Sequence, residues 1–227
     1  MWQRYYMGVG ICSMGIDINQ HYYDDATDKI VKMSVKSSSS YTVTEGFYFP
    51  FSKAGKEGSV GLDLASTVNL FNYNVGTVNY SSETVATETG FCYQAIVPFA
   101  LVYKSGGEAI LNKKSKFLFT CGAGIAPSYA ITKVFSPGLS FSARKFIMAE
   151  MGYHAGIAFK LRATAYFGKM TLVNAEGDDF FYTSSFKSTG YGVVDNTVTG
   201  KTGITLTLAL MPFSWAWAKK DDFDYSN

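Results

Sequence analysis

Residues 145–159 alternate between two kinds of side chain, and this alternation constrains the fold more than any other feature of the chain. One row is apolar and the other is small or polar apart from Met148. The apolar row contains Ile147, Ala149, Met151, Tyr153, Ala155, Ile157 and Phe159, and the other contains Glu150, Gly152, His154, Gly156 and Ala158. A period of two residues indicates a β-strand, and this run exceeds the usual strand length of about five or six residues. We therefore predict a strand whose outer face meets lipid and whose inner face lines a narrow, packed, polar lumen.

The same alternation predicts seven further strands. They are expected at about 4–19, 41–52, 58–73, 91–104, 114–129, 163–182 and 201–215. The alternation slips near 13–15, which we interpret as a bulge, and Pro98 interrupts a strand that should avoid proline. Short connections are expected at 53–56, 105–113 and 160–163, the last a tight turn with two cations, and long connections at 20–40, 74–90, 130–143 and 183–200.

An even number of strands joined alternately by short and long connections is typical of membrane barrels. The predicted fold class is therefore all-β: an eight-stranded antiparallel up-and-down transmembrane β-barrel with short periplasmic turns and long extracellular loops. The barrel would cover residues 1–215, and residues 216–227 would form a charged periplasmic tail. Both termini would then be periplasmic, in a bacterial outer membrane.

Composition agrees with strands rather than membrane helices. Hydrophobic residues make up 47% of the chain and charged residues 17%, yet no run approaches the roughly 18 apolar residues of a membrane helix. The net charge of +2 argues against nucleic acid as a partner. Residues 1–10 lack the apolar segment of a signal peptide, so we expect this numbering to describe a mature chain. The three cysteines have no metal-ligand spacing and are expected to be unpaired.

Aromatic residues at the two ends of the chain are expected to form a girdle where the first and last strands pair. Trp and Tyr favour the membrane interface. The predicted girdle consists of Trp2, Tyr5, Tyr6, Phe213, Trp215 and Trp217. A second girdle at the opposite rim would contain Tyr22, Tyr23, Phe71, Tyr73, Phe91, Tyr93 and 180–182.

With these rows in view, almost the whole chain resembles the small outer-membrane barrels of the OmpX and OmpA-barrel type. The segments 122–127 (GAGIAP) and 149–153 (AEMGY) are similar to repeats in barrels from the Bacteroidota. The peptidoglycan-binding domain of the OmpA pattern does not follow the last predicted strand. The chain also ends in Tyr225-Ser226-Asn227 rather than on a closing aromatic residue, whose nearest equivalent is Phe213 or Trp215.

A lumen formed by eight strands is just wide enough for its own side chains, so we expect a polar plug rather than a pore. The predicted plug contains Asp63, Gln94, Glu150 and His154, with Thr120, Thr205 and Thr207 beside them. No catalytic residue, cofactor or metal is expected. Two weaker alternatives stay open: a lipid A-modifying site built from His21, Asp24, Asp25 and 37–40, and a Ca²⁺ or Mg²⁺ site on the acidic loop residues Asp24, Asp25, Asp28, Glu176, Asp178 and Asp179.

The predicted function is that of a non-enzymatic outer-membrane barrel in contact with lipid and lipopolysaccharide. It would serve as an envelope structural protein or as an accessory subunit docked on a larger outer-membrane complex. Small outward residues would let a partner approach closely, and the candidates are Ala95, Ala149 and Ala155. The rivals are a lipid A-modifying enzyme and a soluble lipocalin-like barrel, which would turn the aromatic rows inward around a ligand.

Overall fold

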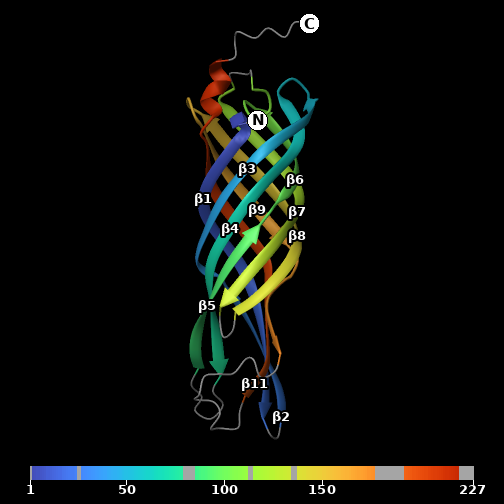
Figure 1. The fold of residues 1–227 in the computed structure, drawn as a ribbon, viewed down its shortest axis with the longest axis vertical. Coiled ribbons are helices and arrows are strands. Elements are labelled where there is room, and N and C mark those ends of the chain that lie inside the picture. Colours follow the sequence, from blue (N-terminus) through green and yellow to red (C-terminus); the bar gives the residue numbers. More distant parts are fainter. Residues whose placement is uncertain are drawn as a thin grey trace.

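The computed structural model describes residues 2–24, 27–78, 85–111, 115–133, 137–176 and 192–219, which form a closed antiparallel barrel (Figure 1). The strands are β1 (Tyr5–Asp24), β2 (Thr27–Lys36), β3 (Ser38–Ala54), β4 (Gly58–Val78), β5 (Val85–Ile96), β6 (Phe99–Gly106), β7 (Phe117–Lys133), β8 (Pro137–His154), β9 (Ala158–Phe167), β10 (Met170–Glu176) and β11 (Gly192–Met211). Short 3-10 helices, η1 (Trp2–Arg4) and η3 (Ser214–Lys219), flank them. Within the described ranges, no helix is long and apolar enough to cross a membrane.

These segments make a ring of eight barrel strands, as predicted. β2 runs on into β3, β5 into β6 and β9 into β10, and β11 closes the ring by pairing with β1 from Met7↔Leu210 onward. Pro98 separates β5 from β6 without shifting the register, because β4 pairs with both segments in one continuous alignment. The Pro98 carbonyl still accepts a hydrogen bond from the Ala65 amide at 3.1 Å. The proline therefore removes one donor from the ladder and leaves the strand order intact.

The two ends of the barrel differ. One end, the turn end, carries η1, η3 and the short turns at 55–57 and 155–157, and the other, the hairpin end, carries the long extensions of β1, β2, β4, β5 and β11 (Figure 1). The turn predicted at 160–163 is wrong: the chain reverses at 155–157, where Gly156 has φ +85°, a conformation that favours glycine.

Much of what was predicted as long loops is paired strand. Residues 27–36 pair with β1 as far as Asp24↔Thr27, and β4 pairs with β5 as far as Val78↔Val85. β7 and β8 likewise pair through Lys133↔Pro137. The ladders therefore continue well past the predicted strand ends, because polar residues pair along a backbone ladder as readily as apolar ones.

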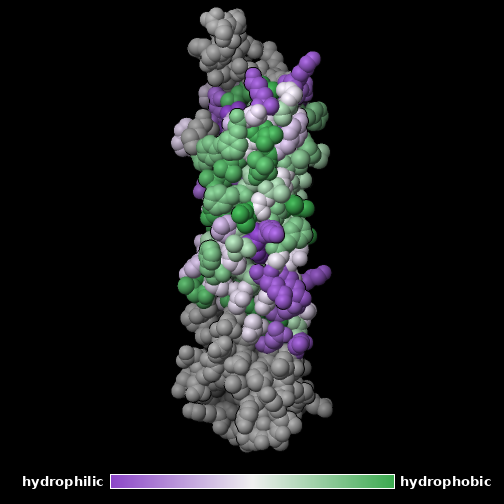
Figure 2. Space-filling view, turned by 90° about the vertical axis from the view of Figure 1, so that its right-hand side faces the viewer, coloured by the Kyte–Doolittle hydropathy of each residue, from purple (hydrophilic) through white to green (hydrophobic). Residues whose placement is uncertain are grey.

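The outer wall near the turn end is apolar, as the alternation predicts. Figure 2 shows a band of hydrophobic side chains over this part of the wall, with hydrophilic ones at the rim of the turn end and again nearer the hairpin end. The exposed residues include Met7, Val9, Ile11, Leu101, Ile125, Ile147, Leu161, Leu206 and Leu208. A continuous apolar surface of this extent requires lipid or protein against it. The lipocalin-like alternative is wrong, because it would place these rows inside the barrel.

The polarity of the wall inverts toward the hairpin end while the strand keeps its facing. In β1 the inward row runs through Cys12 and Met14 into the buried Ile16 and Ile18, whereas Ser13 faces outward. A bulge at the predicted level is confirmed by the register shift between Met14 and Ile16, whereas the slip in the hydropathy pattern of β1 itself reflects a change of environment, because the facing of the strand is unchanged. The register shift at this level places the extra residue on β11, between Gly200 and Gly203, opposite Gly15.

An apolar core fills the lumen of the hairpin half. Its buried members are Cys12, Met14, Ile16, Ile18, Phe71, Tyr73, Cys92, Ala130, Met170, Leu172 and Val198. The placement of Phe71 and Tyr73 in an outer girdle is wrong, since both point into this core. Apolar residues inside and polar residues outside are the arrangement of a barrel in water. The strands thus have apolar residues outside and polar residues inside near the turn end, a zone we call the apolar belt. Nearer the hairpin end the same strands have apolar residues inside and polar residues outside.

Candidate functional site

A network of buried ion pairs occupies the lumen of the turn half. It joins three cations, Lys104, Lys160 and Arg162, to three carboxylates, Asp63, Glu108 and Glu150. Glu150 lies at its centre: one carboxylate oxygen contacts Lys104 at 3.4 Å and Lys160 at 3.2 Å, and the other contacts Arg162 Nε at 2.8 Å. The network is neutral in sum, which is the arrangement that buried charges require.

Neutral side chains complete the coordination of these charges. Thr120 donates a hydrogen bond to Glu150 at 2.8 Å, and the Tyr6 hydroxyl donates to Asp63 at 2.6 Å while accepting from Arg162 at 2.6 Å. The Tyr6 ring also packs against two cations, at 4.4 Å from Lys160 Nζ and 4.2 Å from Arg162 Cζ. Tyr6 therefore fixes the network through both its ring and its hydroxyl.

The segment after β6 folds back and closes the turn end. Gly106, at φ +96°, starts a turn that brings Glu108 into the lumen, where it contacts Lys104 at 2.7 Å. Arg4 holds the same turn from outside through its Nε, which donates to the Glu108 carbonyl at 3.1 Å. Trp217 of η3 covers the opening: its ring stacks on His154 at 5.3 Å and its indole N–H donates to the Gln3 carbonyl at 3.0 Å.

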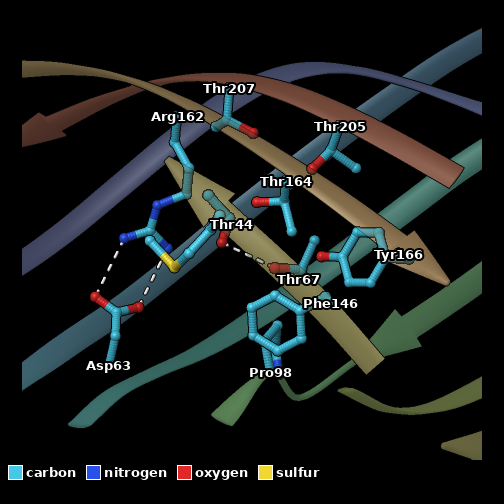
Figure 3. A pocket seen from close by; sticks show the side chains of 11 residues that line it. Thr44, Asp63, Thr67, Pro98, Phe146, Arg162, Thr164, Tyr166, Thr205 and Thr207 are labelled. Atoms are coloured by element: carbon cyan, nitrogen blue, oxygen red, sulfur yellow. Dashed lines mark hydrogen bonds and ion pairs between the residues drawn. The ribbon is translucent and has the colours of Figure 1, made fainter. Parts of the chain in front are cut away.

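A ring of threonines lies between the ion network and the middle of the lumen. Figure 3 shows the residues around a small cavity here, with Arg162 bound to Asp63 at one side and Tyr166 and Phe146 at the other. Its threonines are Thr44, Thr67, Thr164, Thr205 and Thr207. The cavity measures about 20 Å³, and a second one beside Arg144 measures about 10 Å³. Each has room for about one water molecule.

The structure places the predicted plug residues at three levels of the lumen. Asp63 and Glu150 belong to the ion network. Gln94 is buried farther toward the hairpin end, where it accepts a hydrogen bond from Asn69 at 3.1 Å and donates to the Met170 sulfur at 3.0 Å. His154 lies at the turn end against Trp217, and its Nε2 is 3.2 Å from the Ser214 carbonyl.

The predicted aromatic girdle divides into two groups. Trp2, Tyr5 and Phe213 lie against one another on the outside, with Trp2 centroids 6.3 Å and 6.0 Å from the other two, and Trp215 is exposed nearby in η3. The girdle assignment is wrong for Tyr6 and Trp217, which are buried inside the barrel end. Strict alternation after the outward Tyr5 turns Tyr6 inward, and the 3-10 helix turns Trp217 over the lumen.

The three alanines predicted to contact a partner do not all lie on the wall of the barrel. Ala95 in β5 and Ala149 in β8 face outward. Ala155 is not part of the wall as predicted, because it lies in the exposed turn after β8. The side chains of His21, Asp24, Asp25, Asp28, Glu176, Asp178 and Asp179 lie outside the described residues.

Sequence reasoning missed the cations of the plug and the acid that reaches it from the turn. The sequence analysis predicts Lys160 and Arg162 in a tight turn, and Lys104, Glu108 and Arg144 are not among its lumen residues. A signal was present: Phe159, Leu161 and Ala163 continue an outward apolar row with the two cations on the opposite row. No periodic signal points to Glu108, whose position depends on the fold of a turn.

The apolar belt, the ring of eight strands and the filled lumen together define an outer-membrane type of β-barrel. The crystal structure of the outer membrane protein OprG from Pseudomonas aeruginosa is similar, with a TM-score of 0.50 and 13% identity over 91% of this chain and 94% of that chain. The outer membrane protease OmpT from Escherichia coli gives a TM-score of 0.42 at 8% identity over 91% and 95% of the two chains. Neisserial surface protein A gives 0.34 at 8% identity over 89% and 96%.

The likeness to OprG supports the fold class alone, since the identity is low. No protein-family model and no curated protein matches the chain. The finer resemblance to the OmpX type and to barrels of the Bacteroidota stays a prediction.

Proposed function

We propose that this protein is a closed, non-enzymatic barrel of a bacterial outer membrane that acts by contact, with the turn end in the periplasm. The observation that carries the proposal is the filled lumen. From the turn end, the described residues that fill it are Trp217, the ion network, the threonine ring and the apolar core, and cavities of about 20 and 10 Å³ between them have room for single water molecules. Along this described part of the lumen a solute has no continuous path.

The described histidine forms no nucleophile–base pair. Nucleophilic catalysis requires a hydroxyl or thiol within hydrogen-bond reach of a base. The one histidine with a described side chain, His154, contacts the carbonyl of Ser214 rather than its hydroxyl. That hydroxyl is buried and bonded to the Met211 carbonyl and the Ala158 amide, both at 2.7 Å. The serine therefore closes the end of β11 and has a structural role.

The outer wall offers a place for contact. A groove of about 220 Å³ crosses β8, β9 and β11, and alanines and isoleucines make up most of its lining. Its outward residues are Ala149, Ala163, Ala165, Ile147 and Ile204. Small residues let a second protein pack closely where lipid would otherwise lie, and Ala149 is the predicted contact that falls in this groove. We propose this groove as the face that meets a larger outer-membrane protein.

The test compares two readouts from cells that express the protein. Under the proposal, lipid A masses are the same with and without the protein, and the protein extracted in mild detergent runs as part of a larger complex. Ala149→Trp fills the groove and should release the protein from that complex. Ala143→Trp is the matched control, because Ala143 also faces outward on β8 but does not line the groove.

Either of two results would contradict the proposal. A mass change in lipid A that depends on the protein and disappears in His21→Ala would favour the enzyme alternative. Equal loss of the complex in both tryptophan variants would show that the groove is not the contact.

A further inference from the structure

One acidic side chain interrupts the apolar outer wall, on β3. Glu45 is exposed, and its neighbours in the outward row of that strand are Val43 and Phe47. Among the described residues on the outward rows of the apolar belt, Glu45 is the only acid. A carboxylate that faces lipid is costly unless it has a partner, and an ionisable residue in such a place marks a functional site.

Within the described part of the chain, the partner of Glu45 is a hydroxyl rather than a cation. Tyr5 donates a hydrogen bond to the Glu45 Oε2 atom at 3.1 Å. The Tyr5 ring belongs to the outer aromatic group, with its centroid 5.0 Å from that of Phe47 and 6.3 Å from that of Phe213. Tyrosine and tryptophan rings favour the level of the lipid headgroups. The Glu45 carboxylate therefore lies close to that level.

A groove of about 410 Å³ on the outer wall includes Glu45 in its lining. We call it the Glu45 groove. Its outward residues belong to two rows that run from strand to strand through paired positions. One row consists of Phe159, Leu210, Met7, Glu45 and Ser66, and the other of Leu208, Val9, Val43 and Val68. The residues between the rows, Gly8, Thr44 and Ala209, face the lumen, so no outward side chain fills the space there.

The outward lining of the Glu45 groove is apolar except at one place. Glu45 and Ser66 are directly paired across β3 and β4 and supply a carboxylate and a hydroxyl side by side. An apolar groove with one anionic point matches a molecule that has a hydrocarbon chain and a cationic head. A primary ammonium offers three N–H donors, enough for a carboxylate and a hydroxyl together.

We propose that Glu45 and the Glu45 groove bind one phospholipid with a primary-amine headgroup. The ammonium meets the Glu45 carboxylate, and an acyl chain lies in the groove. A phospholipid already has its ammonium at headgroup level, whereas a protein partner would have to bring a cation to the lipid-facing wall. The site rests on the proposed membrane placement but not on the protein contact proposed across β8, β9 and β11. With the turn end in the periplasm, the lipid belongs to the periplasmic leaflet.

The test is native mass spectrometry of the full chain in mild detergent with an equimolar mixture of three phospholipids that have identical acyl chains. Phosphatidylethanolamine has a primary ammonium, phosphatidylcholine a quaternary one without N–H donors, and phosphatidylglycerol no cation. The wild type should retain one phosphatidylethanolamine, preferred about fivefold over each of the others, a ratio that corresponds to about 1 kcal/mol.

Two pairs of variants separate the headgroup contact from the groove. Glu45→Gln should fold normally, because the side chain is exposed, and should lose the preference for the primary amine. Asp17→Asn should keep it, since Asp17 binds Lys201 beyond the apolar belt. Val43→Trp fills the groove and should reduce retention of all three lipids. Ile125→Trp is its matched control, because Ile125 is 57% exposed against 55% for Val43 and lies on β7, away from the groove.

Equal retention of the three lipids by folded wild-type protein would overturn the lipid site alone. The same holds for an amine preference that survives in Glu45→Gln, or for a protein that copurifies from native membranes and is released by Glu45→Gln. Failure of the chain to insert into micelles or bilayers would instead contradict the membrane barrel itself, so the two failures are distinguishable.

Discussion

Arg162 and Asp63 bind each other side by side in the lumen, with Nη1–Oδ1 and Nη2–Oδ2 distances that are both 3.2 Å. The paired geometry matches the planar guanidinium to the planar carboxylate. Asp63 also meets Lys104 at 3.2 Å and Tyr6 at 2.6 Å, so one carboxylate serves two cations and a hydroxyl. The packing of the lumen in the turn half therefore depends on a few charged side chains with a defined mutual geometry.

Removal of the negative charge of Asp63 should leave buried cations unpaired and destabilise the barrel. Asp63→Asn keeps the shape of the side chain but leaves Arg162 and Lys104 short of one negative charge. We expect it to lower the free energy of unfolding by about 3–5 kcal/mol, the usual loss when a buried pair is broken. The measurement is urea unfolding in lipid vesicles, followed by tryptophan fluorescence.

Two control variants make this test specific to the buried network. Glu45→Gln removes an acid from the exposed outer face of β3 and should cost less than about 1 kcal/mol. Asp63→Asn combined with Arg162→Met restores the charge balance and should recover part of the loss. If Asp63→Asn is as mild as Glu45→Gln, the network does not stabilise the barrel.

The facing of the apolar rows gives a second prediction. Leu64 in β4 and Leu206 in β11 lie on the outer side of the wall. Leu64→Arg or Leu206→Arg should lower barrel stability by about 2–4 kcal/mol in a bilayer, because a cation would then face hydrocarbon. Thr207→Ser, on the lumen side of the same strand, should be nearly silent. Arginine variants as stable as the wild type would show that these rows do not face lipid.

The cysteines provide a third prediction that uses the natural sequence. All three are free: Cys121 is exposed on β7, whereas Cys12 and Cys92 are buried in the apolar core. In folded protein in vesicles, pyrene maleimide should label one site, and brominated lipids should quench that label. Cys121→Ser should abolish the labelling until urea unfolds the barrel. Labelling of Cys12 or Cys92 in folded protein would contradict the packed hairpin core.

Alternation predicted the architecture because facing is a local property of a strand. Whether Leu206 faces outward follows from its two neighbours on each side, and the same holds around the ring. The alternation also places Asp63 and Glu150 on the inner face, where the structure has them in the ion network. Hydropathy failed where the surroundings change along one strand: the inward Ile16 and Ile18 looked like a slip in facing because the lumen becomes apolar there.

The residues that sequence reasoning missed depend on contacts between distant segments. Glu108 reaches Lys160 across 52 positions at 3.1 Å, and only the backward fold of a turn makes this contact possible. Lys160 and Arg162 are predicted in a tight turn because the alternation does not show that the chain already reverses at 155–157.

The most direct test of a lumen that is filled along its described length is conductance across a planar bilayer containing refolded wild-type protein, whose folding is verified by its heat-dependent gel mobility. A lumen closed by Trp217, the ion network and the apolar core predicts no stepwise current above the bare bilayer in 1 M potassium chloride, about ten times the ionic strength of ordinary buffers. Reproducible unitary steps from the folded protein would contradict the account and show an open path through the barrel.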